Sequence, residues 1–335
     1  MKLCRRVFTS FVLVLVVCVP SACGLQKSKK EQRRTPTSKE VVKKSKEQPA
    51  PDAPRAPYAA GALVASLEDP AVDESSGLAA SRREPGLFWT HNDAGDGPFI
   101  YAFDRQGRKR GTFRVAGAQA DDWEDIDAGP GPKPGQSYLY VGDIGDNEFA
   151  RPNIVVYRVA EPQVTPEDAR STRFEPRATE QAEAFALKYT DGQHNAEAMA
   201  VHPRTGDIYV ITKEGEGPAK VYRAAAPAAG ATEGTLERVG EVSAPAAFPG
   251  MITGADISPD GRRVVLCDYV GAYELSVEGN APFDNVWKQT PRVFDPGKRR
   301  QGEAISYSTD GASVFSTSEG KNAQLFEARR QEGKQ

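Results

Sequence analysis

Asp122-Trp-Glu-Asp-Ile-Asp127 is one of five similar hexapeptides that recur along the chain. Each places a hydrophobic residue after a short, mostly polar stretch, and successive hexapeptides are 48, 73, 58 and 48 residues apart. The other four are Glu74-Ser-Ser-Gly-Leu-Ala79, Asn195-Ala-Glu-Ala-Met-Ala200, Thr253-Gly-Ala-Asp-Ile-Ser258 and Gln301-Gly-Glu-Ala-Ile-Ser306. Repeats of this length are typical of β-propeller blades, each of which is built from four short strands.

Each hexapeptide is followed by a turn and a β-rich run. In the fourth repeat, Ser258-Pro-Asp-Gly261 precedes the run 264–267, and glycine supplies the positive φ that closes a hairpin. Further candidate strands follow in each repeat, but the fifth repeat ends after its third strand. Residues 62–67 precede the first hexapeptide and are expected to supply the missing outer strand, which joins the two ends of the chain.

These features predict an all-β protein. The expected fold is a β-propeller of five blades, each of four antiparallel strands, in a ring closed by an N-terminal strand. Two alternatives stay open. A β-sandwich, or several small β domains, also fits a series of short strands, and the 73-residue second repeat is long enough to hold a sixth blade.

Residues 1–23 have the pattern of an export signal, with Lys2, Arg5 and Arg6 before the apolar run 7–19 and small residues at its exit. A helix of that run would measure about 20 Å, which is too short to span a membrane. Residues 24–60 are rich in Lys, Arg and Pro, so we expect a disordered tether. Its positive charge fits an association with anionic lipid or wall polymer, or else a plain soluble spacer.

The exit of the signal, Ser21-Ala-Cys23, resembles the lipobox of bacterial lipoproteins, although Pro20 stands where that family usually has Leu. The resemblance implies that Cys23 is lipidated and that this lipid attaches the protein to a membrane. It also implies sorting to the outer membrane, because Gly24 rather than Asp follows the cysteine. The expected location is therefore the cell envelope, facing the periplasm or the cell surface.

The remaining residues, 61–335, form the predicted propeller domain and are acidic, with 30 basic against 42 acidic residues. Their formal charge of −12 makes nucleic acid a poor partner. The one cysteine of this domain, Cys267, has no disulfide partner and is expected in the core. Gly-x-Ser-x-Gly, P-loop, dinucleotide-binding and His-Glu-x-x-His motifs are absent from the sequence, so those classes of enzyme are not indicated.

Polar residues of the hexapeptides are expected to line the channel, because the first strand of each blade is innermost and alternate side chains share a face. One predicted layer consists of Glu74, Asp122, Asn195, Thr253 and Gln301, and the next of Ser76, Glu124, Glu197, Ala255 and Glu303. Two carboxylates about 5 Å apart repel by roughly 3 kcal/mol at an effective dielectric of 20. They are therefore expected to take up protons or a cation, unless they remain solvated. All-oxygen ligands suit Ca²⁺, and the predicted metal ligands are Glu74, Asp122, Glu124, Glu197 and Glu303.

A second set of polar residues is expected around the channel mouth, where the second strands end. It consists of Asn92, Asp93, Asp143, Asp146, Asn147, Asn195, Asp256 and Glu319. Each cluster of Asp, Asn and Gly also fits a simple turn. Lys213 is the cation at one of these strand ends, where it either meets an anionic substrate or pairs with a neighbouring Glu.

The hexapeptides, together with Asn92-Asp-Ala-Gly-Asp96 and Gly142-Asp-Ile-Gly-Asp-Asn147, resemble a largely uncharacterised family of exported bacterial β-propeller lipoproteins over nearly all of residues 62–330. More distantly, the chain resembles the phytase-like propellers and the calcium-activated nucleotidases (apyrases). Glu74-Ser-x-Gly, and Trp123-Glu124 followed by Tyr140-Val-Gly, are similar to apyrase motifs. That resemblance implies Ca²⁺ at the centre of a five-bladed ring, with Glu74 and Glu124 as ligands. The basic phosphate-binding clusters of phytases have no counterpart here.

Two functions follow as hypotheses. The first is a binding module of the cell envelope, stabilised by Ca²⁺, whose acidic mouth takes a small molecule or an envelope protein. The alternative is a Ca²⁺-dependent hydrolase of phosphoesters or other small esters. In that case Glu197 activates water and Lys213 stabilises the developing charge.

Overall fold

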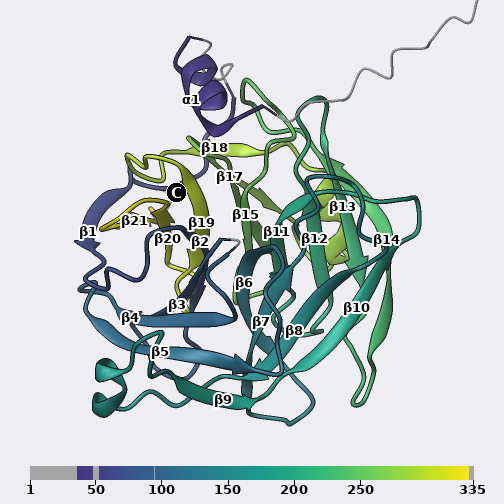
Figure 1. The fold of residues 1–335 in the computed structure, drawn as a ribbon. Coiled ribbons are helices and arrows are strands. Elements are labelled where there is room, and N and C mark those ends of the chain that lie inside the picture. The colour runs from purple at the N-terminus through teal and green to yellow at the C-terminus, as the bar shows by residue number, and fades with distance from the viewer. Residues whose placement is uncertain (1–35, 48–52, 94, 332–335) are drawn as a thin grey trace, which may run out of the picture. The chain divides into compact units, whose positions relative to one another are not determined.

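The structure is a computed structural model that describes residues 36–47, 53–93 and 95–331 (Figure 1). The predicted export signal, with Cys23, and the first part of the predicted tether lie outside the described residues. Among the helices that the structure describes, none is long and apolar enough to cross a membrane.

Nearly all regular structure in the described residues is β-strand. The first sheet contains, in order, β2 (Ser75–Ala80), β3 (Leu87–Asn92), β4 (Phe99–Asp104), β5 (Lys109–Ala116) and β9 (Arg177–Gln181). The eight-stranded sheet contains β11 (Ala196–Val201), β12 (Ile208–Thr212), β13 (Ala219–Ala224), β14 (Glu233–Val242), β10 (Glu183–Tyr189), β8 (Ile154–Ala160), β7 (Ser137–Asp143) and β6 (Trp123–Pro130). The two remaining sheets contain β15 (Gly254–Ile257), β16 (Arg263–Cys267), β17 (Ala272–Ser276) and β18 (Arg292–Phe294), and β1 (Ala62–Ser66), β21 (Gln324–Arg329), β20 (Ser313–Ser318) and β19 (Gly302–Tyr307).

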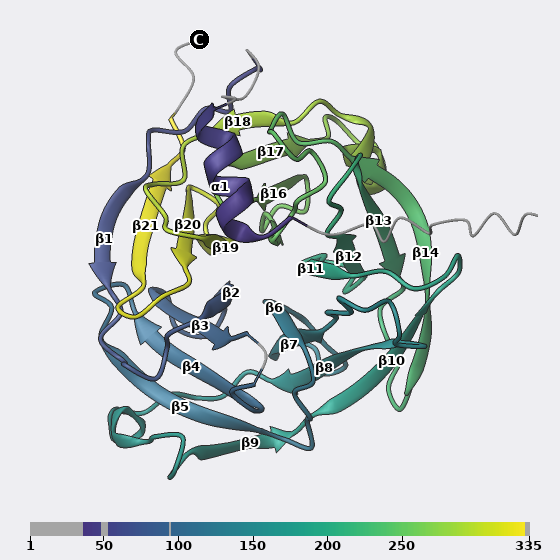
Figure 2. The same cartoon turned by 45° about the horizontal axis from the view of Figure 1, so that its top comes forward.

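The five hexapeptides form the innermost strands β2, β6, β11, β15 and β19. Each of these strands contacts the next one in cyclic order, and β19 contacts β2, so that they surround a common centre (Figure 2). The other strands of each sheet follow outward from this centre. This is the arrangement of a β-propeller, and the all-β prediction is confirmed.

The two ends of the propeller pair with each other, as predicted. Strand β1 is antiparallel to β21, with Ala62 opposite Glu327 and Ser66 opposite Gln324. The N-terminal segment thus supplies the outer strand of the last repeat. This pairing occupies the edge of β21 that the last repeat would otherwise leave unpaired.

The extra length of the second repeat forms an excursion rather than further inner strands. After β8 the chain makes a short 3-10 helix, η1 (Pro166–Arg170), and then β9, which pairs in parallel with β5 of the preceding repeat. The chain returns as β10, which pairs antiparallel with β8 and in parallel with β14 of the next repeat. These outer pairings link three neighbouring repeats and explain the eight-stranded sheet.

Apolar residues of the strands pack between neighbouring repeats. Ile126 and Trp123 of β6 pack with Trp89 and Ala79 of the first repeat, and Met199 of β11 packs with Tyr140 of the second. Cys267 is buried as a free thiol in a similar cluster, as predicted.

The segment expected to be a disordered tether is ordered in part. It contains the helix α1 (Ser38–Glu47), and residues 53–60 run along the propeller. Ala56 and Tyr58 are buried in a cluster with Phe294, and the Tyr58 hydroxyl donates to Glu274 at 2.5 Å. Composition alone did not reveal these anchors because the contacts involve few apolar residues.

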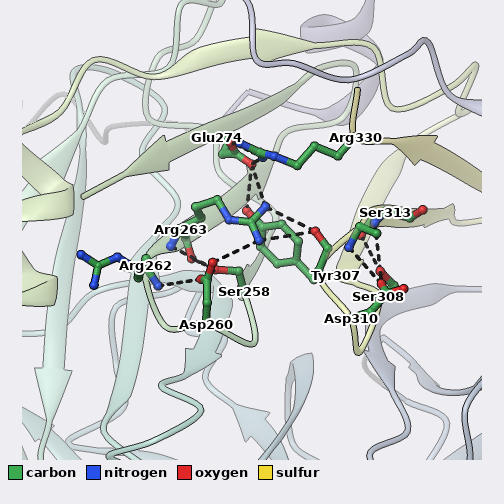
Figure 3. A network of polar contacts seen from close by, with 12 residues as sticks. Ser258, Asp260, Arg262, Arg263, Glu274, Tyr307, Ser308, Asp310, Ser313 and Arg330 are labelled. Atoms are coloured by element: carbon green, nitrogen blue, oxygen red, sulfur yellow. Dashed lines mark hydrogen bonds and ion pairs between the residues drawn. The ribbon is translucent and has the colours of Figure 1, made fainter. Parts of the chain in front are cut away.

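The Tyr58–Glu274 contact belongs to a polar network at the junction of the last two repeats, where Glu274 meets Arg330, Tyr307 and Arg263 (Figure 3). Arg330 follows β21, whereas Glu274 lies on β17. A second 3-10 helix, η2 (Phe283–Lys288), lies between β17 and β18 and packs its Trp287 against Tyr209 of β12.

Candidate cation site at the channel mouth

In most of the inner strands, a β-bulge falls at the third residue of the hexapeptide. In four of the five inner strands, the pairing with the next strand skips one residue, namely Ser76, Glu124, Glu197 or Glu303. A bulge leaves this residue outside the ladder and re-aims its side chain. Ala255 has the same place in the fourth hexapeptide, but β15 pairs without a bulge, and Ala255 packs in the core instead of lining the channel.

Three carboxylates converge where β3 ends and β6 begins. One oxygen each from Asp93, Asp122 and Glu124 lies within 4.8 Å of the others. Asp93 and Asp122 are partly exposed, whereas Glu124 is buried. A Cβ atom at Gly145 would clash with the carboxylates of both Asp122 and Glu124, so the absence of a side chain there lets the β7–β8 loop close over this trio.

The carboxylates of the trio raise one another's pKa values. Burial raises the pKa of Asp122 to about 6, and the neighbouring Asp93 adds to the effect, while Arg151 opposes it. Burial also holds the pKa of Glu124 well above its usual range, and the nearby Glu197 and Asp93 raise it further. A bound cation would favour the ionised carboxylates and so offset both the burial and the repulsion that raise these pKa values. The donor set is all oxygen, which fits Ca²⁺ better than a transition metal.

Glu197 and Lys213 form a buried ion pair beside the trio. The Lys213 Nζ atom also lies 5.2 Å from the centroid of the Tyr269 ring. Burial lowers the pKa of Lys213, but Glu197 and Tyr269 outweigh this effect and leave it raised, so the ammonium is charged. Of the two roles predicted for Lys213, the structure shows pairing with a neighbouring Glu.

Glu303 belongs to a different group of polar residues. The Gln301 Nε2 atom donates to Glu303 Oε1 at 3.0 Å and to Glu319 Oε2 at 2.6 Å. Burial and a contact with Glu319 hold the pKa of Glu303 well above its usual range. Glu74 lies next to this group, since its backbone bridges to that of Glu319. Of the predicted metal ligands, Asp122 and Glu124 lie in the trio, whereas Glu197 pairs with Lys213, and Glu74 and Glu303 lie beside Glu319.

The remaining residues predicted at the mouth shape its loops. Asn92 Oδ1 accepts the backbone N–H groups of residues 73 and 74. Asp143 accepts those of residues 121 and 122, at 3.1 Å each, and pairs with Arg151 at 2.7 Å. Asn195 Oδ1 accepts the Asp146 N–H at 2.7 Å, and its Nδ2 donates to Asn147 at 3.1 Å. These contacts agree with the turn-forming alternative, and through Asp143 they also hold Asp122 in place.

Asp256 does not lie at the mouth, which corrects its predicted position. It lines a cavity of about 290 Å³ with Asp127, Ser306 and Pro259, at the opposite end of the inner strands. Its carboxylate accepts the Tyr307 N–H at 2.7 Å on the neighbouring β19. β15 has no bulge, so its side chains keep a different phase from those of the other inner strands.

The sequence did not reveal the roles of two acidic residues of the second hexapeptide, Asp125 and Asp127. Asp125 accepts the N–H groups of Met199 at 2.9 Å and Ala255 at 3.3 Å, and Asp127 accepts that of Val201 at 2.6 Å. They satisfy backbone groups on other inner strands and so tie the centre of the ring together. The signal was present in the aligned hexapeptides, because Asp125 and Asp256 occupy the same position.

Replacing Asp256 by Asn is expected to reduce the loss of stability on raising the pH. Burial raises the pKa of Asp127 to about 6 and holds that of Asp256 well above its usual range, and the two carboxyls interact. Folding thus favours their protonated forms. The unfolded chain ionises first as the pH rises, so stability is lost up to the folded-state pKa values.

We expect wild type to lose on the order of 1–3 kcal/mol more than Asp256→Asn between pH 5 and 7.5, measured by urea denaturation. Asn keeps an acceptor for the Tyr307 N–H and cannot ionise. Glu278→Gln, at an exposed carboxylate, serves as the control. An identical pH dependence in wild type and Asp256→Asn would show that this pair does not titrate on unfolding.

No protein-family model matches the chain, and none of the curated proteins matches it. Among solved structures, the chain is similar to one described as "Structure of Dos1 propeller", with 10% sequence identity and a TM-score of 0.34, over 75% of this chain and 67% of that chain. The strand pairing described above, rather than this likeness, carries the fold assignment. The resemblances to exported lipoproteins, apyrases and phytase-like propellers stay predictions.

Proposed function

We propose that the protein is a five-bladed, Ca²⁺-binding propeller of the cell envelope, anchored by lipid on Cys23, whose mouth binds a small molecule or an envelope protein. The convergence of Asp93, Asp122 and Glu124 within 4.8 Å carries the proposal. The cyclic contacts of five innermost strands support the number of blades.

The trio is suited to an ion that a ligand can reach. Ca²⁺ takes six to eight oxygen ligands, whereas the trio offers three carboxylates. Asp93 and Asp122 are partly exposed, so the remaining positions face the mouth. Water or an oxygen of a bound partner would complete the shell. A binding module of this kind recognises its partner through the ion as well as through the surrounding loops.

The proposal predicts that Ca²⁺ stabilises the protein. At 100 times its dissociation constant, an ion that binds the folded state alone raises the free energy of unfolding by about 2.7 kcal/mol. The test is the melting temperature and urea denaturation of the purified protein in Ca²⁺ and in a chelator. Asp122→Asn should abolish the stabilisation, since it removes one charge and one ligand from the trio.

Glu214→Gln is the matched control for this experiment. It makes the same chemical change near the mouth but outside the trio, where Glu214 pairs with Lys220 at 3.2 Å. It should leave the response to Ca²⁺ intact. The cation site would be refuted if wild type showed no stabilisation by Ca²⁺, Mg²⁺ or Mn²⁺.

The partial exposure of the trio also fits the hydrolase alternative, because a metal-dependent hydrolase requires an open coordination position on its ion. In this alternative the ion would polarise a phosphoester or small ester. Glu197 would need to leave Lys213 before acting as a base, since the two are paired. Turnover of p-nitrophenyl phosphate or acetate that depends on Ca²⁺ and is lost in Glu197→Gln would favour it.

A further inference from the structure

Helix α1 docks on the mouth side of the propeller (Figure 2). Its Val41, only 2% exposed, packs against Met251 and Tyr269, which lie just before β15 and just after β16. Val42 and Phe248 border this contact, and the Lys44 Nζ atom lies 4.5 Å from the centroid of the Phe248 ring. One face of the helix thus packs against the propeller.

The docking face has helical spacing. Positions 38, 41, 42 and 45 of the helix are the less exposed ones among residues 38–46, and they are one turn apart on one side. The lysines at 39, 43, 44 and 46 are exposed. The segment is therefore a basic amphipathic helix with a narrow apolar stripe, which the wider composition of the tether had obscured.

Tyr269 connects the docked helix to the acidic site. Tyr269 lies under Val41 and also faces the ammonium of Lys213, which pairs with Glu197. Glu197 in turn is close enough to Glu124 to raise its pKa. A positively charged helix that rests on Tyr269 is therefore coupled to the trio by packing and by charge.

The contact that docks α1 is small. Isolated helices shorter than about 12–15 residues are marginal in water, so α1 gains its order from docking. Among the α1 side chains that the structure describes, Val41 is the one that is buried. A contact of this size is easily reversed.

We propose that α1 is a removable lid, which covers the Met251–Tyr269 side of the mouth and weakens the binding of cations there. This inference rests on the proposed cation site. The four lysines of α1 repel an incoming divalent cation, and undocking removes them. Because coupling between two sites is reciprocal, Ca²⁺ in the mouth also favours release of the helix.

Val41→Asn tests the lid in the full chain, because it removes the apolar anchor without changing charge. Lys39→Arg, on the exposed side of α1, is the matched control. Docking is measured by the rate at which trypsin cleaves within residues 39–47, and Ca²⁺ affinity by calorimetry. We expect Val41→Asn to speed cleavage and to tighten Ca²⁺ binding about 5-fold or more, and Lys39→Arg to do neither. Ca²⁺ should also speed cleavage of wild type.

Cleavage of Val41→Asn at the wild-type rate would show that α1 is not docked, and would overturn the lid. Faster cleavage with unchanged Ca²⁺ affinity would also overturn it, because the helix would then dock without guarding the site. Neither result would argue against the proposed Ca²⁺ site. Failure of Ca²⁺ to bind any of the three proteins would overturn the proposed function and the lid together, while the cleavage rates would still report on docking.

Discussion

Replacing Lys213 by Ala is expected to lower the free energy of unfolding by about 3–5 kcal/mol. The variant leaves Glu197, which is 7% exposed, without its counter-charge inside the mouth. It also removes the ammonium from the face of Tyr269. Urea denaturation at pH 7.5 measures the loss. The effect should shrink at pH 5, because burial already raises the pKa of Glu197 and the unpaired carboxyl can take up a proton.

A double variant separates the ion pair from the volume of its side chains. Lys213→Met with Glu197→Gln removes both charges and keeps similar shapes, so it should recover most of the stability. Lys220→Ala breaks the more exposed pair with Glu214 and should cost no more than about 1 kcal/mol. If Lys213→Ala cost as little as Lys220→Ala, the unpaired Glu197 of the variant would have to be solvated or protonated at pH 7.5.

The sequence predicted the inner strands and the ring closure because both rest on local pattern. Each hexapeptide carries its own hydrophobic position, and residues 62–67 form a short strand that can pair with β21. The excursion through η1 and β9 had no such signal. Its parallel pairing with β5 joins residues more than 60 positions apart, and nothing in the short segment Arg177–Gln181 specifies that partner.

The candidate site was predicted only in part. Asp122 and Glu124 were identified as ligands, whereas Asp93 was placed at the mouth without a role. Asp256 was placed at the mouth, but it is the fourth residue of its hexapeptide and lines the cavity at the opposite end of the inner strands. A bulge shifts the phase of side chains by one residue, and among the five inner strands β15 alone lacks one.

The order of α1 was missed for a similar reason. A helix with Val41 and Val42 as its apolar residues has too weak a pattern to predict without its partner surface. That surface consists of Phe248, Met251 and Tyr269, more than 200 residues away in the chain. The composition of a segment shows how much apolar surface it can bury, but not which distant residues it packs against.

Replacing Glu274 by Ala is expected to cost about 3–5 kcal/mol and to weaken the junction at which the two ends of the propeller meet. Glu274 is 1% exposed, and its carboxylate accepts from Arg330 Nη1 at 2.8 and 2.9 Å (Figure 3). It also accepts from the Tyr58 hydroxyl at 2.5 Å. These partners come from the residues after β21 and before β1. Without the carboxylate, Arg330 and Arg263 face each other without a shared counter-charge.

Urea denaturation of Glu274→Ala measures this loss, and two variants show where it arises. Asp310→Ala removes a carboxylate from the nearby exposed turn and should cost about 1 kcal/mol or less. Tyr58→Phe removes one donor to Glu274 and should cost about 1.5–3 kcal/mol, as expected for a hydrogen bond to a charged group. The order Glu274→Ala, Tyr58→Phe, Asp310→Ala follows if the buried carboxylate is the centre of the network. Equal costs for Glu274→Ala and Asp310→Ala would instead mean that strand pairing between β1 and β21 closes the ring without help from this carboxylate.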